Sequence, residues 1–321
     1  MRKLVMVALL ALAQGFAMVA AAPAAEWPAR PIRIIAPSTP GGSADLFARL
    51  LAEVLAPKFH QPVIVDNRGG AGGLIGAAAV ARAEPDGYTF VTSSVAYHAI
   101  APAVSPNPGF DPVRDFTHIA YLGGPPNVIV AHPALGVHSI RELVALARGR
   151  GPIDYVSPGV GTLGHLLVES FAKNTGIAMQ HIPHKGSAQA MLDLIAGNVK
   201  VGTMTFSSTS GQIRAGTVIP LAVSSNTRVA EFPDLPTLRE EGFDLVALTW
   251  YALSGPAGLP DDIVTRLNRA VNEAWALPEI KQRLAADAIA TEAMTPQQVT
   301  RFVADEVRKW GPIAKQVVQN P

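Results

Sequence analysis

Short apolar runs alternate with amphipathic stretches along almost the whole chain. The runs have the length of buried strands, and they predict strands at 32–36, 63–65, 88–92, 153–157, 180–182, 219–224 and 249–253. The stretches between them predict helices at 46–55, 76–83, 139–148, 164–174 and 188–196, with a mostly helical C-terminal part. Such alternation is typical of an α/β protein whose sheets are mainly parallel and carry helices on both faces.

Two parts of the chain repeat one arrangement: a strand, a loop with glycines and hydroxyls, and a helix. The first is 32–55 and the second is 153–174. Because ligands of open α/β sheets bind at the carboxyl ends of the strands, two such halves facing each other would line one cleft from both sides.

The first of these loops is Pro40-Gly41-Gly42-Ser43-Ala44-Asp45. A helix that starts after two glycines presents unpaired N–H groups and the positive end of its dipole, which attract a carboxylate or a phosphate. Asp45 is too acidic to face that anion, so we expect it to order the first turn of the helix. The segment therefore predicts an anion-binding loop.

Composition narrows the function classes. The chain has 321 residues, 49% of them hydrophobic and 16% charged, which is enough for two domains with sizeable cores. The formal net charge is +1 without a basic face, so nucleic acid is not an expected partner. The absence of cysteine excludes disulfides, thiolate catalysis, cysteine metal sites and a lipidated N-terminal cysteine.

Residues 1–25 have the pattern of a secretory signal peptide. Arg2 and Lys3 precede an apolar stretch at 4–20, and Ala22-Pro23-Ala24 offers small residues for cleavage. The alternative is an uncleaved membrane anchor, for which this run is short compared with the roughly 20 residues of a spanning helix. We therefore expect an exported, periplasmic protein whose mature chain does not insert into a membrane.

Motifs for enzymatic chemistry are missing or incomplete. A Gly-x-Ser-x-Gly elbow and a phosphate-binding Gly-Lys-Ser/Thr loop do not occur, and the glycine-rich segment 69–76 has Ile75 where a dinucleotide loop needs its third glycine. His181 and His184 are close enough to share a metal, but Pro183 between them favours ordinary loop histidines. We therefore predict no catalytic residues, no metal and no cofactor, and an exported enzyme is the weakest of the open alternatives.

What remains is a set of loops that offer hydrogen-bond donors. Gly41 to Ser43 lie in the first half, Ser93 and Ser94 follow the strand 88–92, and Gly161 and Thr162 precede a helix of the second half. Lys185 carries the one positive charge among these loops. Such a set suits a small carboxylate held mainly by neutral hydrogen bonds.

An ordered series of motifs, spread over about residues 27 to 316, resembles the substrate-binding proteins of the tripartite tricarboxylate transporter family, the Bug receptors. The motifs are Trp27-Pro28-Ala29-Arg30-Pro31, Pro40-Gly41-Gly42-Ser43-Ala44-Asp45, Asn67-Arg68-Gly69-Gly70-Ala71-Gly72-Gly73, Asp86-Gly87-Tyr88-Thr89, Tyr155-Val156-Ser157-Pro158-Gly159-Val160-Gly161-Thr162 with His165, Pro183-His184-Lys185-Gly186-Ser187, Leu235-Pro236-Thr237 and Pro256-Ala257-Gly258-Leu259-Pro260.

The resemblance implies a two-lobed type II periplasmic binding protein fold, with parallel-rich sheets flanked by helices and two crossover strands. We expect lobe 1 to comprise 26–123 plus 249–321 and lobe 2 to comprise 124–248. A receptor of this family would close on a small organic acid by hinge motion and deliver it to a membrane permease of one large and one small subunit. A monomer is expected. The alternative is a sensing receptor of the same fold that signals to a membrane sensor kinase.

The family pattern also indicates the ligand-binding residues. They are Pro40, Gly41, Gly42, Ser43, Asp45, Ser93, Ser94, Gly161, Thr162, His165, Lys185, Gly186, Ser187, Met204 and Thr205.

The sequence departs from that pattern at Ser38-Thr39, Leu163-Gly164, His184 and Met204. Met204 and Leu163 would give an apolar wall, which leads to the hypothesis that the ligand is a larger or aromatic acid.

Overall fold

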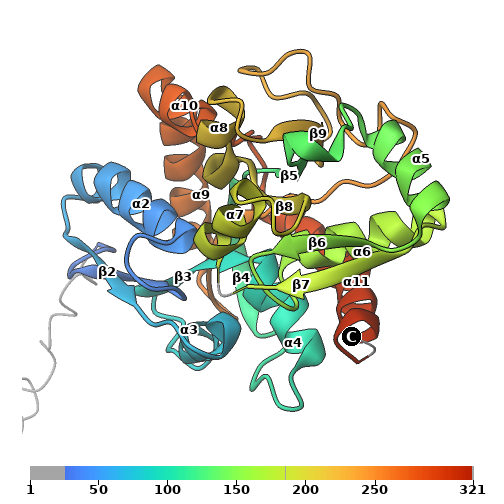
Figure 1. Ribbon diagram of the computed structural model, residues 1–321. Coiled ribbons are helices and arrows are strands. Elements are labelled where there is room, and N and C mark those ends of the chain that lie inside the picture. The colour runs from blue at the N-terminus through green and yellow to red at the C-terminus, as the bar shows by residue number, and fades with distance from the viewer. Residues whose placement is uncertain (1–25, 185, 320–321) are drawn as a thin grey trace, which may run out of the picture.

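The computed structural model describes residues 26–184 and 186–319, so the expected signal segment and Lys185 lie outside the described residues. The described chain is built on two separate five-stranded sheets, one in each half of Figure 1. None of the helices in this part of the chain combines the length and the apolar character needed to cross a bilayer.

The first sheet takes its strands from both ends of the described chain. Across the sheet they are β2 (Val63–Asn67), β1 (Ile32–Ala36), β3 (Thr89–Ser94), β10 (Tyr251–Pro256) and β4 (Phe116–Gly123). The neighbours β2, β1 and β3 are parallel, whereas β10 runs antiparallel to β3 and to β4.

The second sheet repeats this order with strands from the middle of the chain. They are β7 (Met179–Pro183), β6 (Ile153–Ser157), β8 (Val201–Thr205), β5 (Asn127–Ala131) and β9 (Ile219–Val223). Here β5 is the antiparallel strand, between β8 and β9.

The common order confirms the expected parallel-rich sheets with two crossovers. In each sheet the antiparallel strand is the one that follows a crossover, since β5 comes directly after β4 of the first sheet and β10 after β9 of the second. The hydrophobic pattern predicted neither β4 nor β5. Both are buried along nearly their whole length, so they lack the alternation of a half-exposed strand.

Helices cover both sheets. In the first lobe α2 (Ser43–Phe59) packs on β1, β2 and β3 and against α9 (Asp261–Trp275). In the second lobe the inward positions of the strands alternate between two cores, with Tyr155 of β6 on the side of α6 (Leu163–Thr175) and the adjacent Val156 on the side of α7 (Ser187–Ile195). The remaining helices are α3 (Leu74–Ala81), α4 (Ala101–Val104), α5 (Ile140–Arg150), α8 (Phe206–Arg214), α10 (Pro278–Ala285) and α11 (Pro296–Gln319), with the short turns η1 (Ala71–Gly73), η2 (Val95–Ile100) and η3 (Pro133–Leu135).

The two crossovers lie side by side. The N–H of Thr249 donates to the carbonyl of Pro125 at 3.0 Å, and Pro126 pairs with Leu248 as an isolated antiparallel bridge. Gly124 is required at this contact, because a Cβ there would lie 2.3 Å from the carbonyl oxygen of Thr249. The two crossover segments therefore run next to each other between the sheets and are joined by these hydrogen bonds.

The C-terminal helix α11 contacts elements of both sheets. It packs on β4, η2 and α4 of the first half and on α6 of the second, and Figure 1 shows it beside α6. Its Trp310 is fully buried in a core that also holds Tyr121 of β4 and Leu166 of α6. The strands of each sheet lie within one of the two expected lobes, whose exact boundaries stay a prediction. The helix α11 packs against both lobes.

Candidate functional site

A cavity of about 680 Å³ lies between the two halves of the molecule. Its walls come from the loops and helix starts that follow β1, β2 and β3 on one side, and from those that follow β6, β7 and β8 on the other. The first side contributes Ser43, Ala71, Gly72, Leu74, Val95, Ala96, Ile100, Ala101, Val104 and Ser105; the second contributes Pro158, Val160, Gly161, Thr162, Leu163, Gly164, Ser187 and Thr205; and Asn127, Thr249 and Val318 complete it.

The helices α2, α6, α7 and α8 are among those that begin at this cavity. Ser43 is the first residue of α2, Leu163 of α6 and Ser187 of α7, and Thr205 precedes the first residue of α8. The first N–H groups of a helix have no partner within it and lie at the positive end of its dipole. The converging starts of these four helices therefore favour an anion in the cavity.

The described part of the cavity wall contains no charged side chain. Its polar groups are hydroxyls and the amide of Asn127, and the rest is apolar. The described wall therefore offers an anion only neutral donors, while the predicted Lys185 lies outside the described residues. A carboxylate suits such a site, since several N–H and O–H groups can share its charge.

The loop before α2 is ordered from behind by Asp45, which is 3% exposed. One carboxylate oxygen accepts from the N–H of Gly41 and from Nε of Arg49, each at 2.9 Å, and the other accepts from Nδ2 of Asn67 at 3.0 Å. The hydrogen bond from Arg49, with those from Gly41 and Asn67, lowers the pKa of Asp45 against the effect of its burial. Asp45 therefore orders the loop, as expected, and its carboxylate is satisfied within the protein.

The loop before α6 is ordered in a similar way. The Thr162 hydroxyl donates to the carbonyl of Gly159 at 2.8 Å and accepts from the N–H of His165 at 3.4 Å, so Thr162 is the N-cap of α6. The N–H of Gly161 donates to Nδ1 of His165 at 3.1 Å. The N–H groups of Leu163 and Gly164, which precede the first intrahelical bond from Leu166 to Thr162, are left for a ligand.

The predicted site residues fall into three groups. Ser43, Gly161, Thr162, Ser187 and Thr205 line the cavity. Pro40, Gly41, Gly42 and Gly186 lie in the loops beside it, where the N–H groups of Gly41, Gly42 and Gly186 bond to Asp45, Thr39 and Pro158. Asp45, Ser93, Ser94, His165 and Met204 are buried, and Lys185 is outside the described residues.

Ser93 and Ser94 are buried because their strand runs further than the predicted 88–92, and Met204 is buried because it lies within β8. Pairing with β10 extends β3 to Ser94, and pairing with β5 extends β8 to Thr205. Ser93 then bonds to Ser254 at 2.7 Å and Ser94 accepts from the N–H of Ala96, while Met204 lies in the core beneath α7. Of the two residues expected to form an apolar wall, only Leu163 lines the cavity.

The sequence did not indicate several residues of the cavity wall. Ala71 and Gly72 belong to the glycine-rich segment after β2, whose place at the carboxyl end of a strand was an available signal. Asn127, Thr249 and Val318 come from the crossovers and from the last turns of α11, and only the tertiary fold brings them to the cavity.

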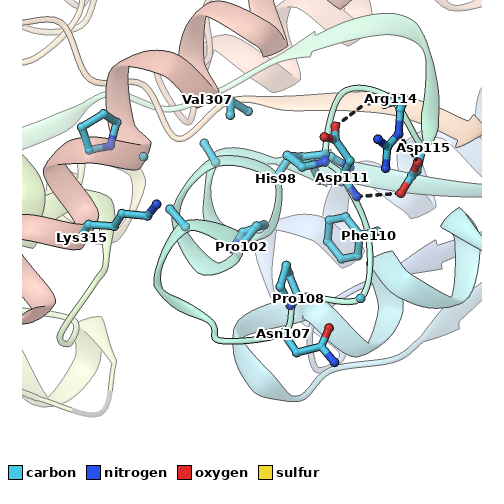
Figure 2. A pocket seen from close by; sticks show the side chains of 16 residues that line it. His98, Pro102, Asn107, Pro108, Phe110, Asp111, Arg114, Asp115, Val307 and Lys315 are labelled. Atoms are coloured by element: carbon cyan, nitrogen blue, oxygen red, sulfur yellow. Dashed lines mark hydrogen bonds and ion pairs between the residues drawn. The ribbon is translucent and has the colours of Figure 1, made fainter.

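A larger cavity of about 980 Å³ lies on the other side of α4, between the segment 98–115 and α11 (Figure 2). Asp111 and Asp115 place two carboxylates in its wall, where Asp115 accepts from the N–H of Asp111 at 2.7 Å and from Nε of Arg114 at 3.2 Å. Arg114 and Lys315 line the same cavity, so its wall carries charges of both signs, unlike the described wall of the cavity between the lobes.

Comparison with known proteins agrees with this geometry. The tripartite tricarboxylate transporter family receptor matches residues 47–318 of the chain. The chain belongs to this receptor family. It is 36% identical to BugT of Bordetella pertussis over 293 residues, which cover 90% of each chain.

Two solved structures are similar over almost their full length. An R. palustris protein solved with adipate has a TM-score of 0.79 and 32% identity, over 91% of this chain and 99% of that one. The periplasmic binding protein BugD has a TM-score of 0.73 and 32% identity over the same shares. The protein is thus a solute-binding receptor of the tripartite tricarboxylate family with the two-lobed periplasmic binding fold, and receptors of this family are periplasmic.

Proposed function

We propose that the protein binds a small organic carboxylate in the cavity between its lobes and delivers it to a tripartite membrane permease after export by a cleaved signal peptide. The observation that carries the proposal is the convergence of four helix starts on a cavity whose described wall has no charged side chain. The R. palustris relative solved with adipate supports the same ligand class. No catalytic role is part of the proposal.

Apolar side chains occupy much of the cavity wall and support an acid with a hydrocarbon body. They come from both halves: Leu74, Val95, Ile100 and Val104 on one side, and Val160, Leu163 and Val318 on the other. Closing the lobes on such a ligand would remove its apolar part from water, which contributes roughly 25 cal/mol per Å² of apolar surface. The crossovers at Gly124–Pro126 and Leu248–Trp250 are the hinge of this motion.

The test uses protein purified without refolding. Native mass spectrometry should detect a bound acid of low mass, and a thermal-shift panel of succinate, adipate and benzoate should raise the melting temperature with at least one of them. A ligand at 100 times its Kd adds about 2.7 kcal/mol of stability. Adipamide is the matched neutral control and should have no effect. Two outcomes would contradict carboxylate binding. One is that adipate and adipamide stabilise the protein equally, and the other is that none of the acids stabilises it.

A further inference from the structure

The loop 158–162 of the cleft is held from behind by two stacked histidine rings. The ring of His165, in the first turn of α6, lies 3.8 Å from that of His181 on β7, with 17° between the ring planes. The ring of Tyr155 on β6 lies 5.1 Å from the ring of His181 and 6.5 Å from the ring of His165. His165 is 4% exposed and His181 is partly buried, so the stack lies at the edge of the protein interior.

The hydrogen bond at Gly161 fixes the protonation state of His165. A backbone N–H can only donate, so Nδ1 of His165, which receives it at 3.1 Å, must be without a proton. The single proton of the neutral ring is then on Nε2, which faces Oε1 of Glu169 at 3.9 Å. A second proton on this ring would have to occupy Nδ1, where it would displace the N–H of Gly161.

His181 is bonded to the same loop. Its Nε2 lies 2.7 Å from the hydroxyl of Ser157, and that hydroxyl accepts from the N–H of Gly159 at 3.2 Å. The carbonyl of Gly159 already accepts from the hydroxyl and the N–H of Thr162. The hydroxyl of Ser157 also donates to this carbonyl at 3.2 Å, so its contact with Nε2 of His181 ties the ring to the loop without fixing the ring's tautomer.

Charged groups around the stack come from three elements. Glu169 of α6 accepts from the hydroxyl of Tyr155 of β6 at 2.7 Å, and His184, after β7, lies 3.2 Å from Oδ2 of Asp193 of α7. Burial, then the neighbouring His181, lowers the pKa of His165 to about 4, and burial, then His184, lowers that of His181 to about 4. Both rings are therefore neutral near pH 7.

We propose that His165 is the positioning residue of the cleft loop: its neutral ring, stacked on His181, holds the N–H of Gly161 and thereby sets the wall of the cavity at Val160 to Leu163. The proposal depends on the proposed carboxylate-binding function only in placing the ligand in this cavity. Gly161 has φ +72°, a conformation that is easily lost, and the bond to His165 is what keeps its N–H turned away from the cavity. The N–H groups of Leu163 and Gly164 are then the ones that face a ligand.

Nuclear magnetic resonance of the ¹⁵N-labelled protein tests this without a ligand. Long-range ¹H–¹⁵N spectra should show His165 as the Nε2–H tautomer, with no titration between pH 7.5 and 5. The amide of Gly161 should be protected from exchange. An Nδ1–H tautomer, or a midpoint above pH 6, would overturn the proposal.

Two substitutions distinguish the effect of the hydrogen-bond acceptor at residue 165 from the effect of the imidazole ring. Asn at 165 places Oδ1 near the position of Nδ1 and does not titrate, whereas Leu removes the acceptor. We expect Gly161 exchange in His165→Asn within about threefold of the parent, and at least tenfold faster exchange in His165→Leu. If His165→Leu does not fold, the proposal is still tested by the tautomer of His165 in the parent and by the exchange of the Gly161 amide in the parent and in His165→Asn. Equal exchange in all folded variants would contradict a positioning role.

Adipate serves as the probe of the cleft. At pH 7.5 we expect the Kd of His165→Asn to stay within about threefold of the parent and that of His165→Leu to rise at least tenfold. If the parent does not bind adipate, this ligand assignment fails, while the tautomer and exchange results still decide the role of His165. Adipate binding that is equal in the parent and in folded His165→Leu would show that the loop does not need this ring.

Discussion

A carboxylate oxygen of Asp45 accepts the N–H of Gly41 at 2.9 Å and so holds the first cleft loop in place from within the protein. The same side chain also accepts from Arg49 and from Asn67. An acidic residue four positions after the first loop glycine thus stabilises the loop with a carboxylate that is satisfied within the protein.

Replacing Asp45 with Asn should destabilise the protein by about 1–3 kcal/mol, because one acceptor becomes a donor that faces other donors. Arg49→Ala is the matched control; Arg49 is exposed, so its loss should cost no more than about 1 kcal/mol. Urea unfolding at pH 7 measures both. A larger effect at Arg49 than at Asp45 would show that the ion pair, and not the loop contact, stabilises this region.

New carboxylates at the helix starts should abolish ligand binding without unfolding the protein. Asp in the first turn of a helix is favourable for folding, so Ser43→Asp and Ser187→Asp should keep the melting temperature. A charge 4–5 Å from the bound carboxylate costs about 3–4 kcal/mol at an effective dielectric of about 20, which weakens binding about 100-fold or more. Ser139→Asp, at the N-cap of α5 and away from the cleft, is the control. Calorimetry with the acid found in the thermal-shift panel measures the Kd. Unchanged binding in both cleft variants would place the ligand elsewhere.

The sequence predicted the two cleft loops because each carries local signals: a strand, glycines, a hydroxyl and a helix. It failed where tertiary contacts decide. β4 and β5 are buried on both faces, so their apolar residues show no period of two. Ser93 is interior because pairing with β10 extends β3, and Met204 is interior because β8 pairs with β5. Val318, more than 150 residues after the loop 158–162, reaches the cavity only through the packing of α11 on both lobes.

Stability should fall as the pH drops from about 6.5 to 4, because burial lowers the pKa values of His118, His165 and His181 to about 4. In that window the unfolded chain, with histidine pKa values near 6.5, binds more protons than the folded protein. Each such group adds a slope of at most about 1.4 kcal/mol per pH unit. Urea midpoints at pH 7.5, 6 and 5 measure it. His118→Gln, which keeps a donor for the carbonyl of Pro112, should reduce the slope. A midpoint independent of pH would contradict neutral buried histidines.

Glu306 should be replaceable by Gln but not by Leu. Its Oε2 accepts the indole N–H groups of Trp250 and Trp310, each at 2.9 Å, and so joins α11 to the crossover before β10. Burial raises the pKa of Glu306 in spite of Lys309 and these two donors, so the charge itself costs stability. Gln keeps an acceptor and removes the charge, and Glu306→Gln should unfold within about 1 kcal/mol of the parent at pH 7. Leu leaves two indole N–H groups unpaired in the core, at about 1–3 kcal/mol each. Urea unfolding followed by circular dichroism compares the two variants. Equal stability of Glu306→Gln and Glu306→Leu would show that packing, and not this shared acceptor, fixes α11 against the crossover.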